Sequence, residues 1–345
     1  MSPKNITDHR IYGLDFLKYI CCLFVIFIHM EFPSTVEVII LPLTRVAVPC
    51  FFMITGYFYE QTCKKDEGKK QIKKVIGFTL CANMLHLGWS FCKVALASES
   101  FAEYAKTLFS KENLVNLLLF HQPPYRVSLW YINGLLVLLL LVLLLQKWES
   151  CLKKFYVLIP LLMAGNLVFG TYSFVFCNME VPLQYTRNAV FCGLPCFLLG
   201  DCFKHKKVHF KNVWLVFGTL VFAVCSVGES WILHHHNVMN SDFLLSTPFF
   251  AAFVFLWFLQ NESRLAKSNI VIFIAGLGAK YSFIIYIIHS ILIEFWSKGM
   301  ELILLPPLFA DTLLYVSPLA ILMFSTMMAV IWDKTTNWFK KKFEV

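Results

Sequence analysis

The chain has 345 residues, of which 58% are hydrophobic and only 15% are charged, and its formal net charge is +9. Soluble domains carry about 25% charged residues, and the mean hydropathy here is high, at +0.67. This composition excludes a water-soluble globular protein, because too few polar side chains are present to cover its surface. The length therefore divides into membrane-spanning helices of roughly 20 residues each.

Apolar segments of spanning length recur along the whole chain. They predict an all-α polytopic integral membrane protein with about ten transmembrane helices. The segments are 13–32, 36–59, 74–97, 128–145, 155–172, 183–200, 213–233, 243–259, 281–297 and 312–332. Gly193 and Pro195 are expected to kink the short sixth segment. The stretch 270–278 is too short to cross and predicts an interfacial helix, and 114–120 predicts a re-entrant or lateral helix over the outer mouth.

Positive charges alternate from loop to loop. Loops 60–74, 146–154, 201–212 and 260–280 and the C-terminal tail are rich in Lys or Arg, whereas the intervening loops are acidic or mixed. Because basic loops stay in the cytoplasm, this pattern predicts that both termini are cytoplasmic. The net charge is thus a topology signal, and no nucleic-acid partner is expected.

Residues 1–345 are expected to form one membrane domain without an additional soluble domain. No small-residue cleavage site follows the first apolar run, so this run is expected to be a retained span. Most of the 12 cysteines lie inside apolar runs and are interpreted as small buried hydrophobes. The consecutive histidines 234–236 would point in different directions on a helix, so no metal site is expected.

Ionisable residues inside a span are costly and are therefore candidates for function. The first span carries Asp15, Lys18 and His29. Lys18 and His29 lie on one helical face, about 16 Å apart along the axis. A cation and an imidazole in line suit an extended ligand that is anionic at one end and reactive at the other. The alternative is that Lys18 snorkels to the interface and that His29 is capped by a polar neighbour.

Other polar residues lie deep in later spans. Arg45 should face a cavity that binds phosphate or carboxylate, or else form a structural ion pair with Asp15 or Glu294. His289 is near the middle of the ninth span, where a histidine usually hydrogen-bonds another helix; Glu294 is either its charge partner or an outer-leaflet site residue. Arg187 begins the sixth span.

Trp130 and Tyr131 begin the fourth span. Aromatic residues at the end of a span more often form an interfacial belt than a substrate platform. Both readings stay open at the level of sequence.

Five segments together resemble the acyltransferase-3 family of membrane proteins. The family opens with Leu-Asp-x-Leu-Arg and, after ten intervening residues, a His; here Leu-Asp-Phe-Leu-Lys at 14–18 precedes His29. The other similar segments are 45–57, Leu-Trp-Tyr-Ile at 129–132, 187–200 and 281–289. They cover nearly the whole chain in the right order. Lys18 replaces the usual Arg, which keeps the charge but loses the bidentate fork, and Thr55 replaces the usual Ser.

The resemblance implies an O-acyltransferase of a bacterial inner membrane. Such proteins move an acyl group, often acetyl, from cytoplasmic acyl-CoA to a hydroxyl of a cell-surface carbohydrate or glycolipid. His29 would be the general base or a transient acyl carrier, and Lys18 and Arg45 would hold the anionic part of the donor. Asp15, Trp130, Tyr131, Arg187 and His289 would support the site or bind the acceptor. Acyl-CoA is a co-substrate, so no permanently bound cofactor is expected, and membrane lipids surround the domain.

Two further functions compete with this one. A transporter or flippase would share the spans and the buried charges, although no inverted repeat is visible. A non-catalytic module of a surface-polysaccharide system would tolerate Lys18 in place of the arginine that is usual in the family. Neither the acceptor, the acyl chain nor the oligomeric state follows from the sequence.

Overall fold

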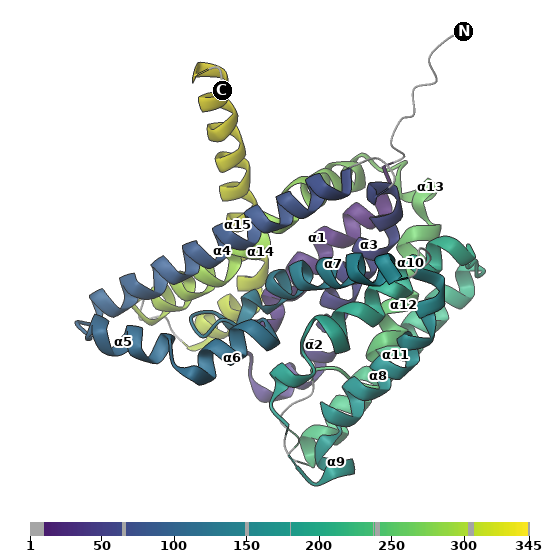
Figure 1. Cartoon of the computed structure of the whole chain (residues 1–345), viewed down its shortest axis with the longest axis horizontal. Coiled ribbons are helices and arrows are strands. Elements are labelled where there is room, and N and C mark those ends of the chain that lie inside the picture. Colours follow the sequence, from purple (N-terminus) through teal and green to yellow (C-terminus); the bar gives the residue numbers. More distant parts are fainter. Residues whose placement is uncertain are drawn as a thin grey trace.

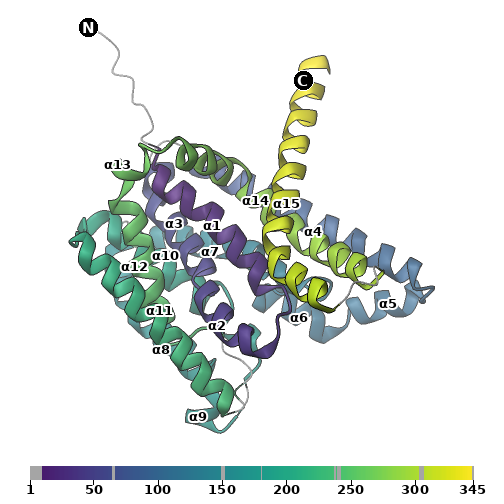
Figure 2. The same ribbon diagram turned by 180° about the vertical axis from the view of Figure 1, so that it is seen from behind.

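A computed structural model describes residues 10–63, 67–148, 152–179, 181–236, 238, 242–302 and 307–343, and these residues form helices and loops without a strand. The first half contains α1 (Tyr12–Ile28), α2 (Ser34–Thr44), α3 (Ala47–Cys63), α4 (Glu67–Leu96), α5 (Phe101–Leu108), α6 (Lys111–Phe120), η1 (Val127–Leu129) and α7 (Trp130–Trp148). The second half contains η2 (Leu152–Val157), α8 (Leu158–Phe169), α9 (Ser173–Cys177), η3 (Leu183–Tyr185), η4 (Ala189–Gly193), α10 (Leu194–Lys206), α11 (Asn212–His235), α12 (Thr247–Gln260), α13 (Glu262–Leu265), α14 (Asn269–Leu302) and α15 (Pro307–Phe343). Figures 1 and 2 show these helices from opposite sides.

Among the described residues, seven helical segments are long and apolar enough to cross a membrane. They are Val36–Tyr59, Gln71–Leu96, Val127–Gln146, Leu152–Phe169, Asn212–His235, Asn269–Leu302 and Thr312–Trp338. Helices α1, α10 and α12 also coincide with predicted spans, but they are shorter, with 17, 13 and 14 residues. The all-helical membrane architecture is confirmed, while the number of spans and their orientation stay predictions.

The outward side chains of the peripheral helices are those of a protein surrounded by lipid. Large apolar residues are exposed on α4, α11 and α15, for example Met84 at 72%, Val224 at 72% and Met323 at 70%. Such a surface would aggregate in water but is stable in hydrocarbon.

The prediction of a separate interfacial helix at 270–278 is wrong. These residues belong to α14, which runs without a break from Asn269 to Leu302. The absence of proline in this segment allows the backbone hydrogen bonds to continue. Gly278 lies against the carbonyl of Asp15, where a Cβ atom would come within 2.1 Å of the oxygen. The stretch is therefore held in place by close packing on α1.

The region before the fourth predicted span forms two short helices, α5 and α6, beside the end of α4 (Figure 1). The hydroxyls of Ser100 and Ser110 accept hydrogen bonds from the backbone N–H groups of Glu103 and Asn113 and so cap the two helices.

The sixth predicted span is irregular at its start. A π-helical turn, η4, precedes α10, and the side chain of Asn188 accepts hydrogen bonds from the N–H groups of Val190 and Phe191. This irregular entrance positions Arg187 at the cavity described below.

The interior is built on two close helix pairs, α1 against α14 and α3 against α10. Gly56 and Gly200 allow the second approach: a Cβ on Gly56 would lie 1.9 Å from the Phe197 carbonyl oxygen, and one on Gly200 would lie 2.0 Å from that of Met53. Small residues at such crossings let two backbones come together in a membrane.

The helix ends gather into two opposite groups. At one end, the backbone N–H groups of Tyr12 and Gly13 donate to Glu262, and Tyr59 donates to Gln146. This end adjoins the basic loops predicted at 60–74, 146–154 and 260–280, parts of which lie outside the described residues. At the other end lie the C-terminus of α1 and the N-terminus of α7, where the candidate site is found.

Candidate functional site

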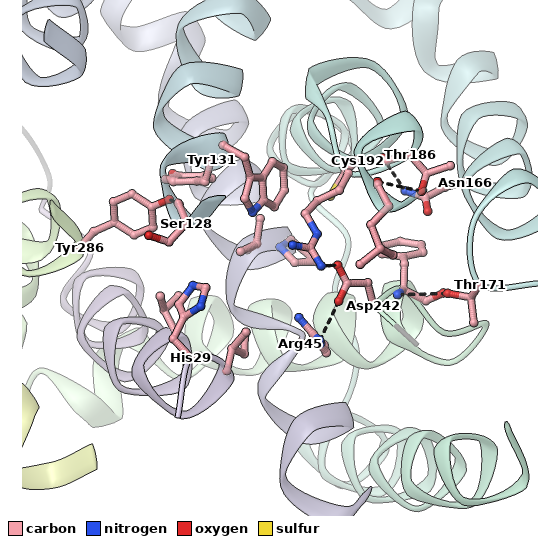
Figure 3. Close-up of a pocket in the computed structure, with 18 residues that line it drawn as sticks. His29, Arg45, Ser128, Tyr131, Asn166, Thr171, Thr186, Cys192, Asp242 and Tyr286 are labelled. Carbon is pink, nitrogen blue, oxygen red and sulfur yellow. Dashed lines mark hydrogen bonds and ion pairs between the residues drawn. The ribbon is translucent and has the colours of Figure 1, made fainter. Parts of the chain in front are cut away.

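Two cavities meet at the C-terminal end of α1. A small chamber of about 60 Å³ lies between α1, the α2–α3 junction, α7 and the segments around Arg187 and Asp242. A larger cavity of about 1200 Å³ opens between the ends of α4 and α14 and the loop before α7. The lining residues common to both are Ile28, His29, Arg45, Ser128 and Arg187. Figure 3 shows His29 facing the chamber across from Arg45.

His29 is the residue that follows the last turn of α1. Its backbone N–H donates to the carbonyl of Ile26, which fixes the end of the helix. The packing of α1 on α14 brings the His29 ring to 5.4 Å from the ring of His289, measured between centroids. The first predicted site residue therefore lines both cavities and has a second histidine beside it.

His289 is buried, and its two ring nitrogens differ. Nδ1 lies 2.6 Å from the carbonyl oxygen of Tyr286. Since a carbonyl only accepts, Nδ1 carries the hydrogen and Nε2 keeps its lone pair. Nε2 is buried and has no hydrogen-bond partner among the described residues. The sequence predicted a bond from His289 to another helix; the observed bond is instead to its own helix, and Glu294 is not its partner.

Two arginines share one carboxylate in the wall of the chamber. An Nη atom of Arg45 lies 2.6 Å from Asp242, and Arg187 pairs with the other carboxylate oxygen of the same residue. The sequence left Arg45 either a cavity or an ion pair with Asp15 or Glu294. It has both a cavity and an ion pair, but with Asp242.

Asp242 was missed as a site residue, because the sequence placed it in an outer loop between two spans. The available signal was indirect: two buried arginines need a counter-charge, and Asp242 is the acidic residue directly before the eighth apolar segment. Only the fold brings residues 45, 187 and 242 together.

Glu294 forms a second shared carboxylate at the mouth of the larger cavity. It accepts from Lys93 at 3.1 Å, from the indole N–H of Trp89 at 2.6 Å, and from Arg126. These contacts join α14 to α4 and to the loop before α7. Of the two roles considered for Glu294, the structure places it in a cavity wall and not beside His289, while the side of the membrane on which it lies stays a prediction.

Trp130 and Tyr131 lie in the chamber wall and are only 8% and 5% exposed. The Tyr131 ring is 4.9 Å from Phe52 and 5.2 Å from Tyr286. An interfacial belt would expose these rings to the lipid headgroups, so their burial excludes that reading in this structure.

Asp15 and Lys18 are placed apart from the cavities. The Asp15 carboxylate is 2.8 Å from the Lys18 ammonium and 2.9 Å from Arg10. Neither residue lines the chamber or the larger cavity. Their predicted role in donor binding at the opposite end of α1 stays a prediction.

The comparison with family models decides the class of this chain. The model of the Acyltransferase domain family, Acyl_transf_3, matches residues 11–332. The chain belongs to this acyltransferase family. The match includes His29, both arginine–carboxylate clusters and all the helices that build the two cavities.

Comparison with individual proteins gives less information about this chain than the family model does. A protein of Enterococcus faecalis named an amino-acid racemase is 27% identical over 316 residues, which cover 83% of this chain and 41% of that relative. The chain thus spans about two fifths of the length of this curated relative. No solved structure matches the chain significantly.

Proposed function

We propose that this acyltransferase-family chain transfers a short acyl group, acetyl in the first instance, from acyl-CoA to a hydroxyl of a cell-surface carbohydrate or glycolipid. The observation that carries the proposal is the position of His29 at the junction of a small enclosed chamber and a large open cavity. A reacting group at this junction can contact two substrates at once. The activity is assigned to the single membrane domain predicted from the sequence.

The surroundings of His29 suit acyl transfer. In the direct mechanism, the imidazole accepts the proton of the acceptor hydroxyl while the hydroxyl oxygen attacks the thioester carbonyl. The carbon–sulfur bond then breaks, and the thiolate of CoA takes up the proton. Arg45 and Arg187 line both cavities, so their guanidiniums can stabilise the negative charge that develops on the carbonyl oxygen.

A covalent route uses the same residues. The imidazole of His29 attacks the thioester carbonyl, the carbon–sulfur bond breaks, and the thiolate of CoA takes up the proton released from the ring. The acceptor hydroxyl then attacks the acyl-histidine, the carbon–nitrogen bond breaks, and the hydroxyl proton returns to the imidazole. The chamber of about 60 Å³ supports a short acyl chain in either route, because it has room for only a few heavy atoms.

The two substrates are proposed to reach His29 from opposite sides of a bacterial inner membrane. The larger cavity lies at the helix ends opposite the basic loops, which the charge pattern places in the cytoplasm. It would therefore take the acceptor from outside. Acyl-CoA would come from the cytoplasm, with its anionic part near Lys18, and membrane lipids would cover the apolar outer faces.

The test is transfer of radiolabel from acetyl-CoA in inverted membrane vesicles. We expect His29→Ala to lower transfer by about 10²-fold or more, because a positioned acid–base group contributes 10²–10⁴-fold. His209→Ala is the matched control, since this histidine is exposed and lines neither cavity. Equal labelling by the native chain and His29→Ala, with both folded, would refute the role of His29.

A second measurement separates the two routes. Purified protein is mixed with labelled acetyl-CoA in the absence of acceptor and denatured within one turnover. Label that stays on the native chain but not on His29→Ala supports the acyl-histidine. Transfer activity without any protein-bound label supports direct attack.

A further inference from the structure

The larger cavity is lined by more positive than negative charge. Its cationic side chains are Arg45, Lys93, Arg126, Arg187 and Lys298, and its carboxylates are Glu31 and Glu294. Lys298 is exposed at the rim and pairs with Glu301 at 2.9 Å. The other four cations are less exposed than Lys298.

These four cations form two groups of the same composition. Arg45 and Arg187 share Asp242 beside His29, and Lys93 and Arg126 share Glu294 at the mouth. Each group combines two positive charges with one carboxylate. With Glu31 as the further carboxylate of the lining, the four cations exceed the three carboxylates by one. Excess charge of this kind is expensive next to a membrane interior and marks a place where an anion is bound.

Unused hydrogen-bond donors point to the same place. The Nε atoms of Arg45 and Arg126 and the hydroxyls of Ser128 and Ser290 are buried and have no partner among the described residues. All four residues line the larger cavity. Ser128 and Ser290 are each only 5% exposed. Buried donors without partners cost free energy unless a ligand or water satisfies them.

We propose that the larger cavity recognises an acceptor that carries a carboxylate or phosphate group in addition to the hydroxyl that is acylated. The mouth group, Lys93 with Arg126, holds the anionic group, and the inner group, Arg45 with Arg187, faces the reacting end near His29. This inference names the acceptor class of the proposed function and rests on it. A second source of the same chemistry is the phosphate of the acyl donor, and the experiment separates the two.

The experiment measures ligand binding to the full chain in detergent by equilibrium dialysis. The probes are glucuronate, glucose 1-phosphate and neutral glucose, with coenzyme A as the probe for the donor. We expect both anionic sugars to bind at least tenfold more tightly than glucose, and their binding to weaken with added salt.

Lys93→Gln is the informative variant, because this side chain is 45% exposed and its replacement is compatible with folding. We expect it to weaken glucuronate binding by about fivefold or more, and Arg126→Gln to do the same. Lys74→Gln is the matched control: it is the same substitution on the same helix, α4, and Lys74 lies outside the cavity. We expect the control to bind glucuronate as the native chain does.

Three outcomes would overturn the inference. These are equal binding of glucose and glucuronate, an equal loss of affinity in Lys74→Gln and Lys93→Gln, and displacement of glucuronate by coenzyme A from a site that also needs Lys93. The vesicle assay is read separately. If acetyl transfer is observed but glucose binds as tightly as the anionic sugars, the proposed function stands and this inference is overturned. Charge-selective binding without transfer would support an anion-binding cavity but overturn the proposed function, and with it the assignment of the bound anion as an acyl acceptor.

Discussion

Asp242 holds two guanidiniums together in the wall of the chamber, and its side chain is 14% exposed. Removal of one partner from a buried ion group leaves the remaining charges without compensation. The two arginines would then repel each other across the space beside His29. At the scale of single residues, the site therefore depends on a carboxylate that makes no direct contribution to the proposed chemistry.

The substitution Asp242→Asn is expected to destabilise the protein by about 3–5 kcal/mol, the usual cost of breaking a buried pair, and to reduce acetyl transfer. Asp333→Asn is the control, because Asp333 pairs with the exposed Lys280 in the first half of α14, and neither residue lines the two cavities. The measurement is the thermal unfolding of both variants in the same detergent. Equal losses in the two variants would contradict the structural role given to Asp242.

His289 is expected to act as a positioning residue for His29. The substitution His289→Gln removes the ring 5.4 Å from His29. We expect kcat to fall while KM for acetyl-CoA stays within about twofold, since the loss is confined to the reacting geometry. A rise in KM with unchanged kcat would instead assign His289 to donor binding.

At the scale of helices, the site depends most on the place where α3 and α10 cross. Phe52 on α3 packs against Tyr131 in the chamber wall, and Cys192 just before α10 lines the chamber. Gly56 and Gly200 lie further along the same two helices and let their backbones approach closely. A side chain at either glycine would separate the helices and open the chamber.

Gly200→Ala is therefore expected to destabilise the protein by about 1–3 kcal/mol, the range for overpacking, despite the better helix propensity of alanine. Gly88→Ala on α4 is the control, because a Cβ atom there meets nothing within 4 Å. Alanine at that position should be neutral or stabilising by up to about 1 kcal/mol. Unfolding midpoints of the two variants in one detergent provide the measurement, and an unchanged midpoint for Gly200→Ala would refute the close crossing.

At the scale of the whole molecule, the helices have one end with basic loops and one end with the cavities. The end of α15 projects beyond the other helices on the same side of the molecule as the start of α1 (Figures 1 and 2). Helices α5 and α6 lie at the opposite end of α4. The charge pattern then predicts which end faces the cytoplasm.

A reporter experiment tests this orientation. A fluorescent protein fused to the C-terminus should be bright, because it folds in the cytoplasm. Alkaline phosphatase inserted at Phe109, between α5 and α6, should be active, because it needs the outer compartment. The reverse pattern would place the larger cavity in the cytoplasm, and the acceptor would then have to come from inside the cell.

The family and most of the secondary structure could be predicted from the sequence. The length of an apolar segment reflects the lipid that surrounds it, so every predicted span is largely helical in the structure. The second span is divided between α2 and α3, and the sixth begins as η3 and η4 before α10. The errors were local. Continuity through 270–278 depends on how Gly278 packs on α1, which a hydropathy pattern does not contain.

By itself, the sequence determined the membrane-embedded helical architecture and the candidate polar residues, because a charge in a span is rare and conspicuous. Tertiary structure alone decided which of these residues meet. His29, Arg45 and Arg187 line common cavities, whereas Asp15 and Lys18 pair with each other away from them. The shared counter-charge of Arg45 and Arg187, Asp242, comes from a segment far away in the chain. Helix packing rather than sequence spacing sets such distances.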